Sequence, residues 1–300
     1  MKTSLHVQRI LSFQEDFAKM SGWVKVVDPP LDTPIFQGVQ HTVVRFVNDS
    51  GEAAYIADGY SGGQRYVKDN IDRWRRVKTP NPVFELPNEP DCNTNTGIQA
   101  LNAFTLGAID SANNYGVKLV CFNFAEGNPH DNGEDSWEPV KWKWGQFVSS
   151  LKAMSKTGHY LGRHAYWRPG VEGPLGQYHA LGRVAWDIST ILSLGINPAE
   201  LRVLVNEFGI DGGIAGHTAQ QGWKMLVTER EYINQVVEAE IGATKMPQVV
   251  AMFLFTSGFY QPWQSYDHDQ NTCANLSTAL KSIVLPETKL FARPIDKHNI

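Results

Sequence analysis

The fold can be predicted from the unit that residues 97–124 form, GIQALNAFTLGAIDSANNYGVKLVCFNF. Apolar residues recur at helical spacing from Gly97 to Tyr115, which predicts an amphipathic helix. Gly116 follows, where a left-handed residue commonly ends a helix, and Lys118–Phe124 is then almost continuously apolar. Such a run is typical of a parallel strand that is covered on both faces. A helix, a stop and a buried strand are therefore expected in succession.

The same alternation of a short apolar run and a longer amphipathic stretch extends through the whole sequence. Eight strands are predicted, at Leu5–Gln8, Trp23–Asp28, Thr42–Val47, Val83–Pro87, Lys118–Phe124, Leu161–Tyr166, Arg202–Asn206 and Val249–Phe255. Helices are predicted at Gln14–Met20, Val67–Val77, Gly97–Tyr115, Val140–Lys156, Pro174–Leu194, His217–Ile241 and 277–284, with a weakly marked one within 31–39. Eight such units predict an α/β protein, a single (β/α)8 TIM barrel that occupies residues 1–300 as one domain.

Glycines mark the period of the repeat and one long insertion. Gly158 and Gly195, like Gly116, each follow a predicted helix and precede a predicted strand. Val47–Gly63, which is rich in Gly, Asp and Ser, is predicted to be a long loop after the third strand. Loops that follow the strands of a barrel lie on its C-terminal face, where active sites are built.

The composition excludes several classes of protein. A hydrophobic content of 42% and a charged content of 19% are ordinary for a globular enzyme, and the net charge of -4 offers no basic surface for nucleic acid or membrane. The three cysteines are too few and too widely spaced for a disulfide framework or a zinc site. No signal peptide is visible, so a cytoplasmic protein is expected, or a secreted one if a leader is missing from the sequence.

Aromatic residues are numerous, with 9 Trp and 10 Tyr. Several tryptophans fall in or near predicted loops and strand ends: Trp137, Trp142, Trp144, Trp167 and Trp263. Flat rings of this kind either stack on the apolar faces of sugars or fill the core, as large aromatic side chains commonly do. The sequence leaves both interpretations open for each of these residues.

Two glutamates stand at the ends of buried strands. Glu89 ends Phe84-Glu85-Leu86-Pro87-Asn88-Glu89 after the fourth strand, and Glu207 follows Val203-Leu204-Val205-Asn206 after the seventh. A single glutamate there would be an ordinary surface or ion-paired carboxylate, but each of these two is preceded by Asn. Strands four and seven face one another across a closed barrel, so the two carboxyl groups are predicted to converge over its axis. Paired carboxyl groups with different pKa values are what acetal hydrolysis requires.

These motifs resemble those of the large clan of retaining glycoside hydrolases with (β/α)8 barrels. Asn88-Glu89-Pro90 is similar to the signature that carries the clan's acid/base on strand four, and Glu207 is similar to its nucleophile on strand seven. The resemblance implies a retaining β-glycosidase in which Glu89 is the acid/base and Glu207 the nucleophile. It further implies that Asn88 binds the sugar 2-hydroxyl, although turn formation after the strand would also explain an Asn there.

Other candidate substrate-binding residues follow from their places at strand ends. Tyr166 is expected to hydrogen-bond the nucleophile or the sugar, and His164 shares its side of the strand but is as readily a core histidine. Arg45 is a charge inside an apolar strand, must therefore be paired, and has the catalytic carboxylates as candidate partners. Gln8 ends the first strand, and Trp167 follows Tyr166 directly.

A ring beneath the reacting sugar is also implied by the resemblance. Trp263 is similar to the tryptophan that follows strand eight in the clan, but it lies farther from the strand end than usual. Phe255 or Phe259 is the alternative occupant of that position.

A cofactor or catalytic metal is not expected, because the nine histidines are scattered and His6-Val7-Gln8 lacks the second histidine of a His-x-His pair. The predicted substrate is an oligosaccharide or polysaccharide, attacked internally, since long loops with several tryptophans favour an open cleft. Two alternatives remain from the sequence: a carbohydrate-binding barrel without turnover, and a cell-wall lysin on the same scaffold. The sequence does not predict an oligomeric state.

Overall fold

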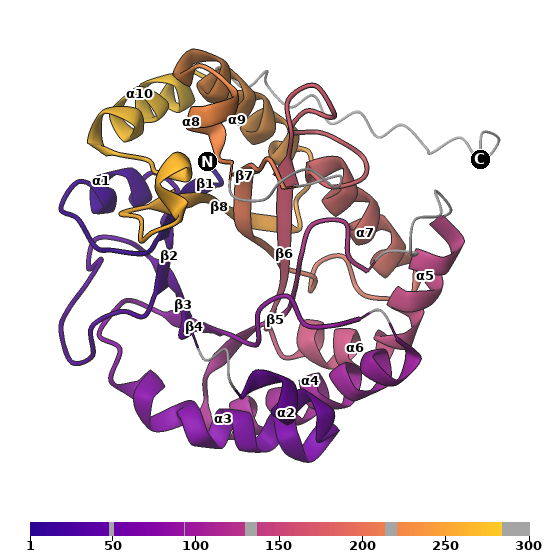
Figure 1. Cartoon of the computed structure of the whole chain (residues 1–300). Helices are drawn as coiled ribbons and strands as arrows, with labels where there is room; N and C mark the ends of the chain where they lie inside the picture. The colour runs from indigo at the N-terminus through magenta and orange to yellow at the C-terminus, as the bar shows by residue number, and fades with distance from the viewer. Residues whose placement is uncertain (48–50, 93, 130–136, 214–220, 284–300) are drawn as a thin grey trace.

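The structure is a computed structural model that describes residues 1–47, 51–92, 94–129, 137–213 and 221–283. Eight parallel strands form a closed barrel in sequence order, with helices around it (Figure 1). The strands are β1 Thr3–Val7, β2 Trp23–Val27, β3 His41–Arg45, β4 Pro82–Glu85, β5 Lys118–Phe124, β6 Tyr160–Trp167, β7 Val203–Ile210 and β8 Val249–Ser257. The ring closes because β1 pairs with β8 as well as with β2. The predicted (β/α)8 barrel is therefore confirmed.

The helices cover the outside of the barrel (Figure 1). They are α1 Gln14–Ala18, α2 Glu52–Ala57, α3 Gly59–Arg75, α4 Asn95–Tyr115, α5 Trp137–Gln146, α6 Val148–Lys156, α7 Leu181–Ser193, α8 Trp223–Leu226, α9 Glu229–Thr244 and α10 Gln270–Lys281, with the 3-10 helix η2 at Trp263–Tyr266. Gly116, Gly158 and Gly195 have φ values of 70°, 72° and 85°. These left-handed conformations confirm the three predicted helix stops. Within the described residues no helix is both long and apolar enough to cross a membrane.

The segment after β3 differs from the long loop predicted at Val47–Gly63. Glu52–Ala57 forms α2, and α3 already begins at Gly59. The glycines serve close helix packing, since a Cβ atom at Gly63 would lie 1.9 Å from the carbonyl oxygen of Phe104 in α4. In this segment glycine marks the contact between two helices, and its loop preference is overridden by packing.

Several predicted helices are absent, shorter or divided. Those that are shorter or divided are Val140–Lys156, Pro174–Leu194 and His217–Ile241. The first is divided at Phe147, the second is helical only from Leu181, and the third lies partly in 214–220, outside the described residues. Residues 31–39 contain no helix, and Pro34 within them cannot supply the backbone N–H that a helix interior needs.

Three strands extend beyond their predicted ends, one of which is β6, which continues from Tyr166 to Trp167. β7 continues from the expected end at Asn206 to Ile210, and β8 continues from Phe255 to Ser257. All eight residues of β7 are buried, so the polar ones among them lie inside the protein. Glu207, which the sequence predicts just beyond the strand, is thus part of it.

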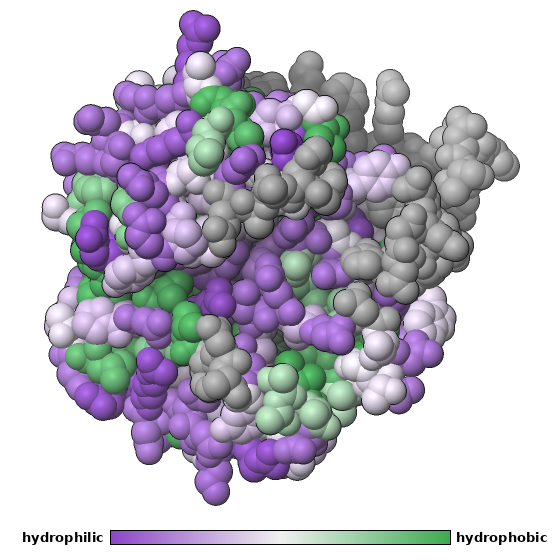
Figure 2. Space-filling view, viewed as in Figure 1, coloured by the Kyte–Doolittle hydropathy of each residue, from purple (hydrophilic) through white to green (hydrophobic). Residues whose placement is uncertain are grey.

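The barrel interior is divided into an apolar lower part and a polar upper part. Residues near the beginnings of the strands form one apolar cluster, which consists of Trp23, Val43, Val83, Val120, Tyr160, Leu204, Ala251 and Phe253. Further along the strands the inward side chains are polar, beginning with Lys25 two residues after Trp23. Figure 2 shows hydrophilic residues gathered in the hollow over the centre of the barrel. The apolar cluster therefore closes one end of the barrel and leaves the other for chemistry.

Candidate active site

A pocket of about 510 Å³ opens at the carboxyl ends of the strands. Every strand of the barrel, or the segment that directly follows it, contributes to the wall. The lining residues are His6, Gln8, Val27, Arg45, Val47, Asn88, Glu89, Glu126, Tyr166, Glu207, Asp211, Gly213, Phe255, Trp263 and Tyr266. This convergence on one pocket is what the predicted barrel requires of side chains that are far apart in the sequence.

Glu207 lies at the inner end of the pocket and is 7% exposed. Its Oε2 accepts a hydrogen bond of 2.9 Å from the Tyr166 hydroxyl. Its Oε1 lies 3.3 Å from Nη1 of Arg45 and 3.6 Å from Nζ of Lys25. The expected pairing of Arg45 with a candidate catalytic carboxylate is thus present. Two cations and one hydrogen-bond donor therefore hold this carboxylate in one orientation.

The surroundings of Glu207 keep it ionised. Burial alone would raise its pKa, but the positive charges of His164, Lys25 and Arg45 outweigh burial and hold the pKa well below its usual range. Burial and the neighbouring carboxylate raise the pKa of Tyr166 well above its ordinary value, so its hydroxyl stays protonated and remains a donor. A buried, ionised and oriented carboxylate is suited to attack an electrophilic carbon.

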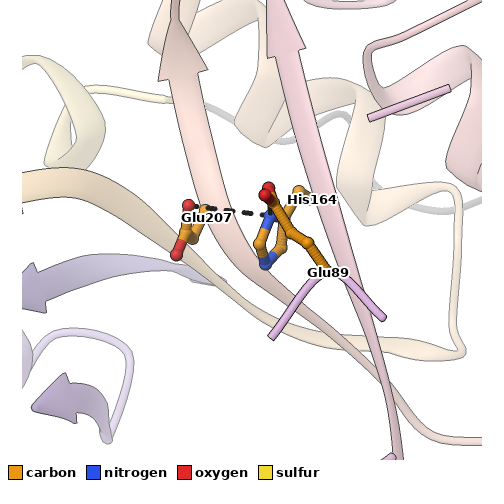
Figure 3. Close-up of side chains that lie close together, drawn as sticks. All are labelled: Glu89, His164 and Glu207. Atoms are coloured by element: carbon orange, nitrogen blue, oxygen red, sulfur yellow. Dashed lines mark hydrogen bonds and ion pairs between the residues drawn. The ribbon is translucent and has the colours of Figure 1, made fainter. Parts of the chain in front are cut away.

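Glu89 follows β4 and differs from Glu207 in exposure, because 44% of its side chain is accessible. Its backbone has a φ of 45°, and its N–H donates to the carbonyl oxygen of Asn123 at 3.1 Å. Its Oε1 lies 3.0 Å from Nδ1 of His164. Figure 3 shows Glu89 beside His164, with Glu207 across from them. The left-handed backbone turns the carboxyl group toward the pocket.

His164 stands between the two carboxyl groups. Its Nδ1 is also 3.6 Å from Oε2 of Glu207, and one oxygen of each carboxylate lies with Nδ1 inside a group whose atoms are all within 4.8 Å of one another. Burial lowers the pKa of His164, but Glu207 and Glu89 more than offset burial and raise it. Such a group of atoms could hold a divalent cation, and it also brings two carboxyl groups in different surroundings within reach of one bound molecule.

The polar side chains beneath the pocket include an ion pair that the sequence interpretation missed. Lys25 and Glu85 have fully buried side chains, and Nζ of Lys25 is 3.0 Å from Oε2 of Glu85. Lys25 interrupts the apolar run Trp23–Val27 in the same way that Arg45 interrupts β3. Reasoning that requires a buried charge to be paired would therefore have identified Lys25 and Glu85 as well.

The lining residues that were not predicted include His6, Glu126 and Asp211. Glu126 follows β5, and burial raises the pKa of its carboxyl group to about 7. Asp211 follows β7 and accepts a hydrogen bond of 2.6 Å from the Tyr266 hydroxyl. Glu126 and Asp211 lie directly after strands, so the same rule that selects Glu89 applies to them.

Asn88, Gln8, Trp263 and Phe255 all line the pocket. Oδ1 of Asn88 is buried and accepts no hydrogen bond from any residue that the structure describes. Oε1 of Gln8 accepts from the backbone N–H of Tyr260 at 3.0 Å. Trp263 and Phe255 pack edge to face with their ring centroids 5.3 Å apart. The two rings, which the sequence analysis named as alternatives for one position, thus line the pocket together.

Trp167 is a correction to the predicted site. It is fully buried, it is not among the lining residues, and its Nε1 donates to Gln235 of α9. Because neighbouring residues of a strand face opposite sides, Trp167 points to the helices when Tyr166 points to the pocket. Trp144 is likewise buried and donates to Asp187 at 2.8 Å, so it belongs to the core.

The remaining tryptophans of that region lie in α5 rather than in a loop. Trp142 is 48% exposed, and Trp137 is the first residue of the helix. Trp142 is not among the residues that line the pocket. Of the two interpretations that the sequence left open, the core applies to Trp144, while Trp142 retains an accessible ring.

Comparisons with known proteins show that the fold of this chain also occurs in solved structures. No protein-family model and no curated protein sequence matches the chain. Among solved structures, a GH5-4 broad specificity endoglucanase from Clostridium longisporum has a TM-score of 0.53 and 10% identity, over 91% of this chain and 85% of that one. XacCel5A has a TM-score of 0.52 and 12% identity, over 94% and 99% of the two chains. The likeness is one of fold. The chemistry therefore rests on the side chains described above.

Proposed function

We propose that the chain is a glycoside hydrolase that cleaves β-glycosidic bonds with retention of configuration. One observation carries the proposal: carboxylate oxygens of Glu89 and Glu207 lie within 4.8 Å of one another in strongly different surroundings. Glu207 is buried among cations, whereas Glu89 is much more exposed. Two carboxyl groups at about 5 Å suit a covalent intermediate, because a water molecule that attacks directly needs a gap of roughly 6.5–9.5 Å.

In the proposed first step, an oxygen of Glu207 attacks the anomeric carbon while Glu89 gives its proton to the leaving glycosidic oxygen. The bond from the sugar to the leaving group breaks as the bond to Glu207 forms. In the second step Glu89, now ionised, takes a proton from water, and the hydroxide oxygen displaces Glu207 from the sugar. His164 lies beside Glu89 and would stabilise its carboxylate between the two steps.

The other lining residues have roles in this proposal. Asn88 would bind the hydroxyl next to the reacting carbon, which its unpartnered Oδ1 allows. Phe255 and Trp263 would contact the apolar face of the sugar ring. Tyr166 and Arg45 would fix Glu207 and disperse its charge until it attacks.

We extend the proposal to an endo-acting enzyme on a polysaccharide. The pocket is polar and lies in an open hollow (Figure 2), so it leaves room for sugars on both sides of the reacting one. The solved structure from C. longisporum is described as an endoglucanase of broad specificity, which is compatible with this assignment.

A digestion panel tests the proposal. Wild-type protein, Glu207→Gln, Glu89→Gln and the surface control Glu200→Gln are incubated with aryl β-glycosides and with β-glucan, mannan, xylan and peptidoglycan. We expect the wild type and the control to release reducing ends, Glu207→Gln to release almost none, and Glu89→Gln to retain the first step on aryl glycosides whose phenol leaves without protonation. Proton NMR should show the β-anomer first.

Three outcomes would contradict parts of the proposal. Binding of a polysaccharide without release of sugar by the wild type would favour a carbohydrate-binding barrel. Cleavage of peptidoglycan alone would favour a cell-wall lysin. Initial release of the α-anomer would show inversion and would exclude Glu207 as a nucleophile.

A further inference from the structure

His6 is a buried histidine at the inner end of the pocket. It lies in β1 beside Phe255 of β8, with the two ring centroids 4.9 Å apart in an edge-to-face arrangement. The residue is 1% exposed and lines the pocket. The mechanism proposed above gives it no role.

The unusual property of His6 is that neither ring nitrogen has a hydrogen-bond partner among the described residues. Two other buried histidines differ in this respect. His159 uses Nδ1 to accept from the N–H of Leu119 and has Nε2 against Asn113. In His268, Nδ1 lies 2.8 Å from a carbonyl oxygen and Nε2 lies 2.7 Å from a tyrosine hydroxyl. Buried polar groups without partners are rare, because leaving them unpaired costs free energy.

The charges around His6 determine its protonation state. Burial lowers its pKa most, the cations Lys25 and Arg45 lower it further, and Glu207 opposes them without prevailing, so the pKa lies well below the usual range. His6 is therefore neutral at physiological pH. A neutral imidazole offers one N–H donor and one acceptor nitrogen.

That pair of functions matches a hydroxyl group, which also donates and accepts. A carboxylate or phosphate would lack the donor that the acceptor nitrogen needs, and a cation would be repelled by Lys25 and Arg45. Both cations lie against Glu207, and His6 lines the same pocket as Glu207, where the sugar would be held during attack.

We propose that His6 binds a hydroxyl group of the sugar that occupies the subsite over Glu207, and that it makes the enzyme selective for sugars that carry this hydroxyl. The inference rests on the proposed glycosidase function and adds to it a specificity residue from β1. We expect the contact to discriminate between substrates. A substrate that lacks the hydroxyl would leave the buried imidazole of His6 without a hydrogen-bond partner, and this costs free energy.

The test combines changes in the protein with changes in the substrate. His6→Ala, His6→Asn and the control His159→Asn are assayed with the 4-nitrophenyl β-glycoside that the wild type hydrolyses best and with its monodeoxy analogues. A β-xyloside serves as the glucoside analogue that lacks the hydroxymethyl group. Melting temperatures show whether each variant is folded. If His6→Ala does not fold, the test is made with His6→Asn, which keeps a donor and an acceptor.

For one analogue, we expect the wild type to show a kcat/KM about tenfold lower than for the parent glycoside. His6→Ala should show the same kcat/KM for both substrates, and His6→Asn an intermediate ratio. His159→Asn should preserve the wild-type ratio for every analogue. An equal loss of kcat/KM on all substrates in the His6 variants would overturn the inference, because that pattern reports a structural role.

Failure of the proposed function gives a different result. If the wild type cleaves none of these substrates, the same variants are tested by calorimetric titration with the oligosaccharides of the digestion panel. Binding that weakens with His6→Ala but not with His159→Asn would support the sugar contact without hydrolysis. Binding that is identical in all proteins would overturn it.

Discussion

Nζ of Lys25 lies 3.0 Å from Oε2 of Glu85, and both side chains are completely shielded from solvent. The same ammonium group is 3.6 Å from Oε1 of Glu207. Lys25 therefore neutralises one carboxylate below the pocket and contributes to the ionisation of the one above it. A buried pair of this kind adds little net stability, but removal of one member leaves the other charge uncompensated.

Lys25→Met should lower the free energy of unfolding by about 3–5 kcal/mol, because Glu85 would remain buried without its cation. The double variant Lys25→Met/Glu85→Leu should recover most of that loss. Urea denaturation of the three proteins measures this, with the exposed Lys156→Met as control. A double variant no more stable than Lys25→Met would show that the ion pair itself is favourable.

Tyr166→Phe should reduce kcat/KM by about 10- to 100-fold, since it removes a hydrogen bond to the charged carboxylate of Glu207. The ring remains to pack against Phe255, so the melting temperature should change little. Steady-state kinetics and thermal unfolding are measured on the same preparation. Full activity in Tyr166→Phe would mean that the hydroxyl does not orient the nucleophile.

Arg45→Met should move the acidic limb of the kcat/KM profile to higher pH. Arg45 is one of the cations that lower the pKa of Glu207, and activity falls on the acidic limb because the nucleophile becomes protonated there. Arg45→Lys keeps the charge and should shift the limb less. An unchanged limb in both variants would assign it to another group.

Glu126→Gln tests the effect of a carboxyl group whose pKa is raised to about 7. Between the unfolded pKa of about 4.3 and this value, the folded protein holds a proton that the unfolded chain has released. The stability of the wild type should therefore fall as pH rises through that window. Glu126→Gln should flatten this part of the curve of unfolding free energy against pH. Parallel curves would show that Glu126 titrates normally.

The sequence was most informative about the barrel itself. Parallel strands that are covered on both faces consist of continuous apolar runs, and a glycine marks the end of three of the helices. The strands and these helix ends can therefore be recognised from local sequence alone. The helices after β3 could not be found in this way. Gly63 favours a loop on its own, and only its contact with Phe104, 41 positions later in the chain, explains why it is helical.

The site was predicted unevenly for a related reason. Glu89 and Glu207 stand in motifs, and Arg45 is conspicuous as a charge in an apolar strand. Lys25 and Glu85 carry the same signal, but their significance depends on a contact across the barrel. Trp167 was misplaced because β6 continues one residue beyond its predicted end at Tyr166, so the alternation of faces turns Trp167 away from the pocket.

Closure of the ring joins the earliest strand of the chain to the last. The hydroxyl of Thr256 donates to the carbonyl oxygen of His6 at 3.0 Å, a contact between positions 250 apart, and Phe255 packs on the His6 ring beside it. A nascent chain in which β8 has not yet been synthesised therefore lacks the part of the pocket wall that β8 supplies beside His6. Ligand capture would then begin only after β8 has been synthesised, and its onset during refolding would report the pairing of β8 with β1.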